Sequence, residues 1–68
     1  MTDKKLSSTD YVVFDKTKNS VLRFGDNEII IYGSYDEAAE DCIDNDEAIR
    51  CTDLPLEFQD ELLIQINN

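Results

Sequence analysis

The chain has 68 residues and a net charge of −10, because sixteen acidic side chains are balanced by only six basic ones. A chain of this length forms one domain with a thin core, which leaves little room for a ligand pocket of about 300 Å³ or more and argues against a metabolic enzyme. The charge disfavours nucleic acid and anionic membranes as partners and favours basic protein surfaces, although acidity also serves solubility alone.

The acidic residues are concentrated in the second half of the chain. Residues 1–34 carry five acidic and five basic side chains, whereas residues 35–68 carry eleven acidic side chains and a single basic one, Arg50. Basic residues are few and do not cluster beside aromatic ones, so we expect no direct binding to nucleic acid.

The first half of the chain predicts a meander of strands. Residues 1–10 are polar and lack periodicity, so we expect a flexible N-terminal arm before a single domain over residues 11–68. Three blocks of aromatic and β-branched residues, at 11–14, 21–24 and 28–32, are separated by turn residues. This pattern predicts three antiparallel strands joined by short turns.

All three predicted strands are apolar on both faces, which is unusual for a sheet that exposes one face to water. Either two helices cover opposite faces, or one face contacts a partner or a second copy of the chain. The face that would make such a contact contains Tyr11, Val13, Ile29 and Ile31.

A capping box predicts where the first helix begins. The Ser34 hydroxyl can accept the backbone N–H of Glu37, and the Glu37 side chain can reach back to the Ser34 amide. Apolar residues then recur with helical spacing, at Tyr35, Ala38, Ala39, Cys42 and Ile43. Acidic residues occupy the other face of this helix, at Asp36, Glu37, Glu40, Asp41 and Asp44. Asn45 and Asp46 are expected to end it.

The last third of the chain predicts a short strand and a second helix. Residues 48–51 can form a fourth strand, and Pro55 suits the first turn of a helix. Apolar residues within 56–66 fit a helical face imperfectly, so a terminal strand is the alternative, but Glu57, Gln59, Asp60 and Glu61 are poor strand residues and favour a helix. The expected fold is therefore α+β, with a small three- to four-stranded antiparallel sheet and two helices in the order β-β-β-α-β-α.

The residue types argue against catalysis. The chain has no histidine, which removes the commonest general base and the commonest metal ligand. Its four serines fit no nucleophile pattern, and a calcium loop read from Asp44 places Ile49 where glycine is required. We therefore expect no enzymatic activity, no metal and no cofactor.

The two cysteines, Cys42 and Cys51, lie at predicted core positions, so we interpret them as buried free thiols, with a disulfide between them as the alternative. No run of eighteen apolar residues exists, and the first residues do not resemble a secretory signal. We expect a cytoplasmic protein without a membrane span.

The acidic helix is the strongest functional feature. Asp36, Glu40 and Asp44 are spaced i, i+4, i+8, which predicts a ridge of carboxylates about 6 Å apart along a helix, and Glu37 with Asp41 would form a second ridge. Like charges at this spacing destabilise a helix by about 0.2–0.5 kcal/mol per pair, which suggests that they serve binding. A solvated helix face that happens to be acidic is the alternative. The predicted partner-binding residues are Asp36, Glu37, Glu40, Asp41, Asp44, Asp46 and Glu47.

Two hypotheses of function follow. The first is an acidic protein-binding module that acts as an inhibitor or nucleic-acid mimic on the basic surface of a nucleic-acid-binding protein. In size, acidity and lack of catalytic residues the chain resembles small phage-encoded inhibitors, some of which imitate DNA, although no motif carries the resemblance. The alternative is an adaptor or homodimerisation domain that uses the apolar sheet face defined above.

Overall fold

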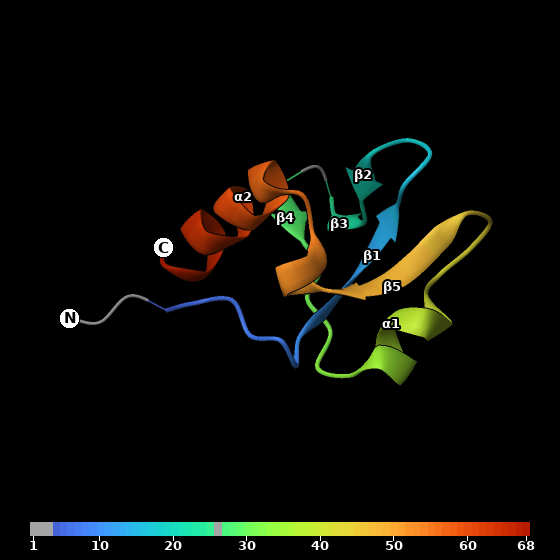
Figure 1. Cartoon of the computed structure of the whole chain (residues 1–68), viewed down its shortest axis with the longest axis horizontal. Coiled ribbons are helices and arrows are strands. Elements are labelled where there is room, and N and C mark those ends of the chain that lie inside the picture. The colour runs from blue at the N-terminus through green and yellow to red at the C-terminus, as the bar shows by residue number, and fades with distance from the viewer. Residues whose placement is uncertain (1–3, 26) are drawn as a thin grey trace.

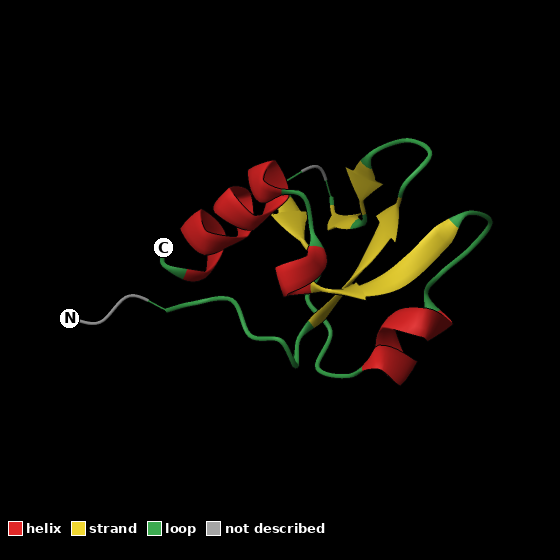
Figure 2. Ribbon diagram, in the orientation of Figure 1, coloured by secondary structure: helices red, strands yellow, loops and turns green. Residues whose placement is uncertain are grey.

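The structure is a computed structural model that describes residues 4–25 and 27–68, and it has the expected α+β architecture (Figures 1 and 2). Within these residues, two helices and a short 3₁₀ turn, η1, accompany two antiparallel sheets. The elements in chain order are β1 (Tyr11–Asp15), β2 (Ser20–Val21), β3 (Arg23–Phe24), β4 (Glu28–Ile29), α1 (Tyr35–Glu40), β5 (Asp46–Arg50), η1 (Cys51–Asp53) and α2 (Leu56–Ile66).

Strand β1 is the centre of the larger sheet, whose order is β2-β1-β5, and β3 pairs with β4 in a separate two-stranded sheet. The pairing of β1 with β5 runs from Tyr11 opposite Arg50 to Asp15 opposite Asp46. The prediction of a helix over residues 56–66, rather than a terminal strand, is confirmed.

The expected meander is interrupted in its second and third strands. The predicted strand 21–24 is divided at Leu22 between the two sheets, and only Glu28–Ile29 of the third strand forms a ladder. The side-chain amide of Gln65, on α2, donates to the Ile29 carbonyl and accepts from the Ile29 N–H, both at 2.9 Å. The hydrogen bonds of the Ile29 N–H and carbonyl are therefore made by a side chain of α2 and not by another strand. Tyr32 returns to β1 as a single bridge to Tyr11.

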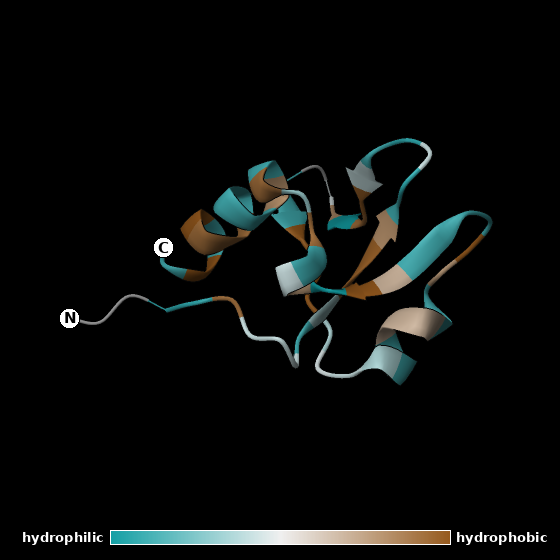
Figure 3. Ribbon diagram, viewed as in Figure 1, coloured by the Kyte–Doolittle hydropathy of each residue, from teal (hydrophilic) through white to brown (hydrophobic). Residues whose placement is uncertain are grey.

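β1 is buried on both faces, which explains the apolar character of its whole sequence. Its residues Val12, Val13 and Phe14 are all buried, although successive side chains of a strand point to opposite faces. Figure 1 shows α1 and α2 on opposite sides of this strand, and Figure 3 shows the apolar colouring along it. The two helices therefore cover opposite faces of β1, which explains why this strand is apolar on both faces.

The main core lies on the α2 side of β1. Val12 and Phe14 belong to a buried cluster whose other members are Val21, Ile29, Cys51, Leu54 and Leu62. The Phe14 ring meets the ring of Phe58, on α2, edge to face with centroids 5.7 Å apart. This geometry is a favourable one for aromatic pairs.

A smaller apolar layer lies on the α1 side of the same strand. Val13 and Ala38 are buried, and Tyr11 packs edge to face against Tyr35 at 5.8 Å. The apolar sheet face expected for a homodimer is therefore not available as a unit, because Val13 is covered on the α1 side and Ile29 is buried in the α2 core.

The described part of the expected N-terminal arm contacts the C-terminal helix and the core. The Lys4 N–H donates to the Asn67 side chain at 2.8 Å, and that side chain donates back to the Lys4 carbonyl at 3.1 Å. Leu6 packs against the main core, and the Asp10 carbonyl accepts the Cys51 N–H at 3.0 Å. Residues 1–3 of the expected arm lie outside the described residues.

The α2 core generates a stability prediction. Leu62 is completely buried, so Leu62→Ala removes apolar contacts and leaves a cavity, and we expect it to lower the free energy of unfolding by about 2–5 kcal/mol. Urea unfolding followed by circular dichroism measures the change. Ile64→Ala is the matched control on the same helix, because Ile64 is 65% exposed and its loss should change stability by about 0.5 kcal/mol or less. Equal losses in the two variants would contradict this core.

Candidate functional site

The structure leaves nearly all of the predicted partner-binding carboxylates in solvent. Six of the seven are exposed and Asp46 is half-buried. Four lie on or directly after α1, and three lie in the turn to β5 and at the start of that strand. They therefore gather around α1 and the end of β5 that follows it, although Glu47 lies opposite Phe14 in the ladder, so its side chain is on the α2 face of the sheet. We call these seven residues the acidic surface.

The helix that carries this surface is shorter than predicted. Ser34 caps it by accepting the Glu37 N–H at 3.3 Å, as the capping box indicated, but the helix ends at Glu40. Its last turn has no basic residue, so carboxylates meet the negative end of the helix dipole without compensation. The predicted ridge from Asp36 through Glu40 to Asp44 is therefore wrong in its last member, since Asp44 lies in a turn with a left-handed φ of 52°.

Within α1 the carboxylates form two rows of different surroundings. At 100° per residue, Asp36 and Glu40 form an exposed row on the Ala39 side of the helix, and Glu37 and Asp41 form the other row. Asp41 accepts a hydrogen bond from the Tyr32 hydroxyl at 2.5 Å. Sequence reasoning missed this partner, because Tyr32 was interpreted only as a strand residue.

The turn after α1 is held by its own acidic residue. The Asp46 N–H donates to the Ile43 carbonyl at 2.9 Å, and the Asp46 carboxylate accepts the Ile43 N–H at 3.3 Å. Asp46 also lies opposite Asp15 in the β1–β5 ladder. Asp15 is buried and accepts from the Thr17 hydroxyl and backbone, and these bonds lower its carboxyl pKa.

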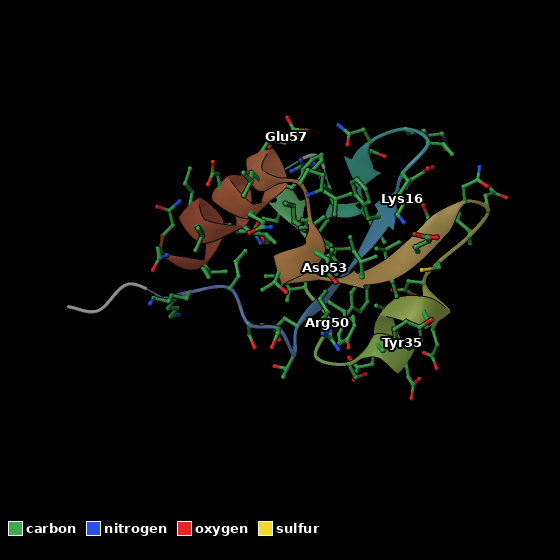
Figure 4. The ribbon with its side chains drawn as sticks, in the orientation of Figure 1. Lys16, Tyr35, Arg50, Asp53 and Glu57 are labelled. Atoms are coloured by element: carbon green, nitrogen blue, oxygen red, sulfur yellow. The ribbon has the colours of Figure 1, made fainter. Side chains whose placement is uncertain are left out.

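Few basic groups neutralise the acidic surface. Among the described residues, one ion pair involves it, between Lys16 and Glu47 at 3.2 Å, and both side chains are largely exposed (Figure 4 labels Lys16). Such a pair contributes little to stability and leaves the field of the other carboxylates intact. The second ion pair joins Arg23 to Glu61, on α2. The acidic side chains of α1 are thus free of ion pairs within the described residues.

Two depressions border the acidic surface. One, of about 430 Å³, is lined by Asp15, Lys18, Ile43, Asp44, Asn45 and Asp46. The other, of about 360 Å³, runs between α1 and β5 and is lined by Tyr35, Ala39, Cys42, Asp46, Glu47, Ala48 and Ile49. We call the second one the α1–β5 groove. The apolar residues of α1 that were expected in the core largely line this groove instead, and Ala38 is the fully buried one.

Both cysteines are free thiols, as expected, but only Cys51 is buried, whereas Cys42 lines the α1–β5 groove and is half-buried. Neither has the environment of a reactive thiol. Burial is the main cause that raises the pKa of the Cys42 thiol, and the carboxylates of Asp46 and Asp41 raise it further. Burial raises the pKa of the Cys51 thiol to about 11. At neutral pH both are protonated and poor nucleophiles.

Within residues 4–25 and 27–68, no group of three histidine, cysteine or acidic side chains is arranged to hold a metal ion. In the same residues, neither helix has the length and apolar character needed to cross a membrane. No protein-family model, curated protein or solved structure that was compared with the chain matches it.

The contact between Tyr32 and Asp41 gives a pH prediction. Burial and the hydrogen bond to Asp41 raise the pKa of the Tyr32 phenol to about 12, because they favour its protonated form. A titration of tyrosinate absorbance should therefore contain a step near pH 12 that is absent from Tyr32→Phe. Asp41→Asn should move this step to lower pH, since it removes a negative charge beside the phenolate. An unchanged step in Asp41→Asn would contradict the contact.

Proposed function

We propose that the chain is an acidic protein-binding module that occupies a basic surface of a nucleic-acid-binding protein, as an inhibitor or nucleic-acid mimic. The observation that carries the proposal is the exposure of the acidic surface, with a single ion pair, between Lys16 and Glu47, involving it among the described residues. A field of this sign steers basic partners toward the surface and can raise association rates by about 10- to 1,000-fold.

The local energetics also support a binding role. Glu40 and Asp41 lie at the C-terminal end of α1, where negative charge is unfavourable, and like charges face one another along the helix. Each such cost is a few tenths of a kcal/mol, and a domain with a thin core has little stability to spare. Carboxylates placed there lower stability, so binding to a cationic partner is a reason to keep them.

The short helix limits how regular the imitation of a phosphate backbone can be. Each row on α1 contains only two carboxylates, about 6 Å apart, and Asp44, Asp46 and Glu47 continue the charge through a turn and a strand. The proposal therefore rests on the density of negative charge over the surface and not on a helical array of phosphate-like groups.

Competition with nucleic acid tests the proposal. The chain is added to purified basic DNA- and RNA-binding domains, each holding a fluorescent oligonucleotide, and displacement is followed by anisotropy at two salt concentrations. The proposal predicts displacement from at least one domain, weakened at the higher salt. The triple variant D36N/E40Q/D44N should compete about tenfold less well, because three exposed charges each contribute up to about 1 kcal/mol.

A charge-matched variant provides the control. E28Q/E57Q/D60N removes the same number of negative charges from exposed positions on β4 and α2 (Figure 4 labels Glu57), away from the acidic surface. We expect it to compete within about twofold of the natural chain. Equal losses in the two triple variants would show that net charge, and not the acidic surface, drives binding, and no displacement from any domain would overturn the proposal.

A further inference from the structure

The outer edge of β5 carries unpaired backbone groups. β5 is the last strand of its sheet and pairs on one side with β1. The Cys51 N–H points toward β1, where it donates to Asp10, and the Asp46 N–H points away, into its turn with Ile43. Backbone N–H and carbonyl groups alternate in direction from one residue to the next along an antiparallel strand. Four further groups of β5 therefore point outward: the N–H and carbonyl of Ala48, the N–H of Arg50 and the carbonyl of Asp46. No hydrogen bond among the described residues uses these four groups.

The other sheet edges within the described residues are short or closed. β2 contains two residues, and the Ile29 backbone of β4 is bonded to the Gln65 side chain. Proteins commonly cover or shorten edges in this way, because an open edge is a template for an added strand. β5, with five residues and no such cover on its outward groups, is the exception.

The α1–β5 groove lies alongside this open edge. Tyr35, Ala39 and Cys42 form its helix side, and residues 46–49 form its strand side. Its volume of about 360 Å³ can take side chains of an added strand, whose alternate residues point to each face of the sheet. An open edge beside a helix groove is suited to binding an extended peptide by strand addition.

The charges around the groove select the kind of peptide. Asp46 and Glu47 line its strand side, and Asp36 and Glu40, which do not line it, form the exposed row of carboxylates on the Ala39 side of α1. We propose that the outer edge of β5 and the α1–β5 groove bind an extended segment of the partner that carries lysine or arginine, which pairs with β5 as an additional strand. This inference rests on the proposed function and specifies how the acidic surface engages its partner.

Arg50 gives the binding site a direction. It lies at the opposite end of β5 from Asp46 and opposite Tyr11, whose ring packs against Tyr35 of the groove, so its positive charge lies near the Tyr35 end of the groove (Figure 4 labels Arg50 and Tyr35). A basic side chain of the peptide is therefore favoured beside Asp46 and Glu47 and disfavoured beside Arg50.

A second copy of the chain fits this edge less well than a basic peptide. Antiparallel pairing of two β5 edges relates the copies by a two-fold axis perpendicular to the joined sheet, which places both α1 helices on the same face. The carboxylates of both α1 helices would then lie on the same face of the joined sheet, on chains that each carry a net charge of −10. Like-charge contacts of this kind oppose the dimer.

Titration of the ¹⁵N-labelled full chain with a blocked heptapeptide of alternating lysine and valine tests the inference. We expect salt-sensitive shift changes concentrated at Ala48, Arg50 and the groove residues of α1, with slower exchange of the Ala48 and Arg50 amides. The same peptide N-methylated at two adjacent central residues should bind about tenfold more weakly, because it loses backbone hydrogen bonds. A peptide with glutamate in place of lysine should not bind.

Two protein variants separate strand addition from charge attraction. Ala48→Pro removes an outward N–H that β1 does not use, so the sheet is retained and binding should fall about tenfold. If this variant fails to fold, the N-methylated peptide alone decides the question. If D36N/E40Q/D44N weakens binding but Ala48→Pro and N-methylation do not, strand addition is overturned and the proposed function stands.

Two further results, binding of the glutamate peptide and self-association of the chain, would each overturn part or all of the inference. Equal binding of the glutamate peptide with shifts on β5 would retain the open edge but overturn the basic partner and the proposed function. Concentration-dependent protection of the Ala48 and Arg50 amides without peptide, together with a dimer in sedimentation, would show that a second copy occupies the edge and would overturn the inference.

Discussion

The burial of β1 on both faces is the constraint on which the rest of the structure depends. Val12 and Phe14 pack under α2, while Val13 packs under α1, so one strand unites two apolar layers. A domain this small lacks the area for two independent cores. Sharing β1 between them allows α1 to pack against both β1 and β5, and that placement creates the α1–β5 groove beside the outer edge of β5.

Much of the fold is predictable because its signals are local. The β-branched block of β1, the Ser34 cap of α1 and the charged residues of α2 each depend on neighbours in the chain. The interruption of the meander was not predictable, since it depends on Gln65, which is 36 residues away from Ile29 in sequence. The spacing of apolar residues also could not show that α1 ends at Glu40, because apolar residues recur with helical spacing as far as Ile43. Carboxylates without a basic neighbour at the C-terminal end of the helix oppose further turns.

The candidate site was predictable in its residues more than in its geometry. The acidic residues are exposed apart from the half-buried Asp46, and the spacing i, i+4 also predicts the two rows on α1. The place of Asp44 was not predictable, because the helix ends at Glu40 and Asp44 lies in the turn that follows. The open edge of β5 depends on the pairing of residues 11–15 with residues 46–50, a contact between distant segments. A one-residue change in that register would turn the outward groups inward, so local patterns cannot identify them.

Hydrogen exchange of the free chain, measured for each amide by NMR, tests the central arrangement most directly. The structure predicts slow exchange for the amides that lie between β1 and β5, at Val12, Phe14, Glu47 and Ile49, because they open only with much of the domain. Ala48 and Arg50, whose N–H groups point outward, should exchange fast. The reverse alternation along β5, with Ala48 and Arg50 protected in the monomer and Glu47 and Ile49 exchanging fast, would contradict both the register and the open edge.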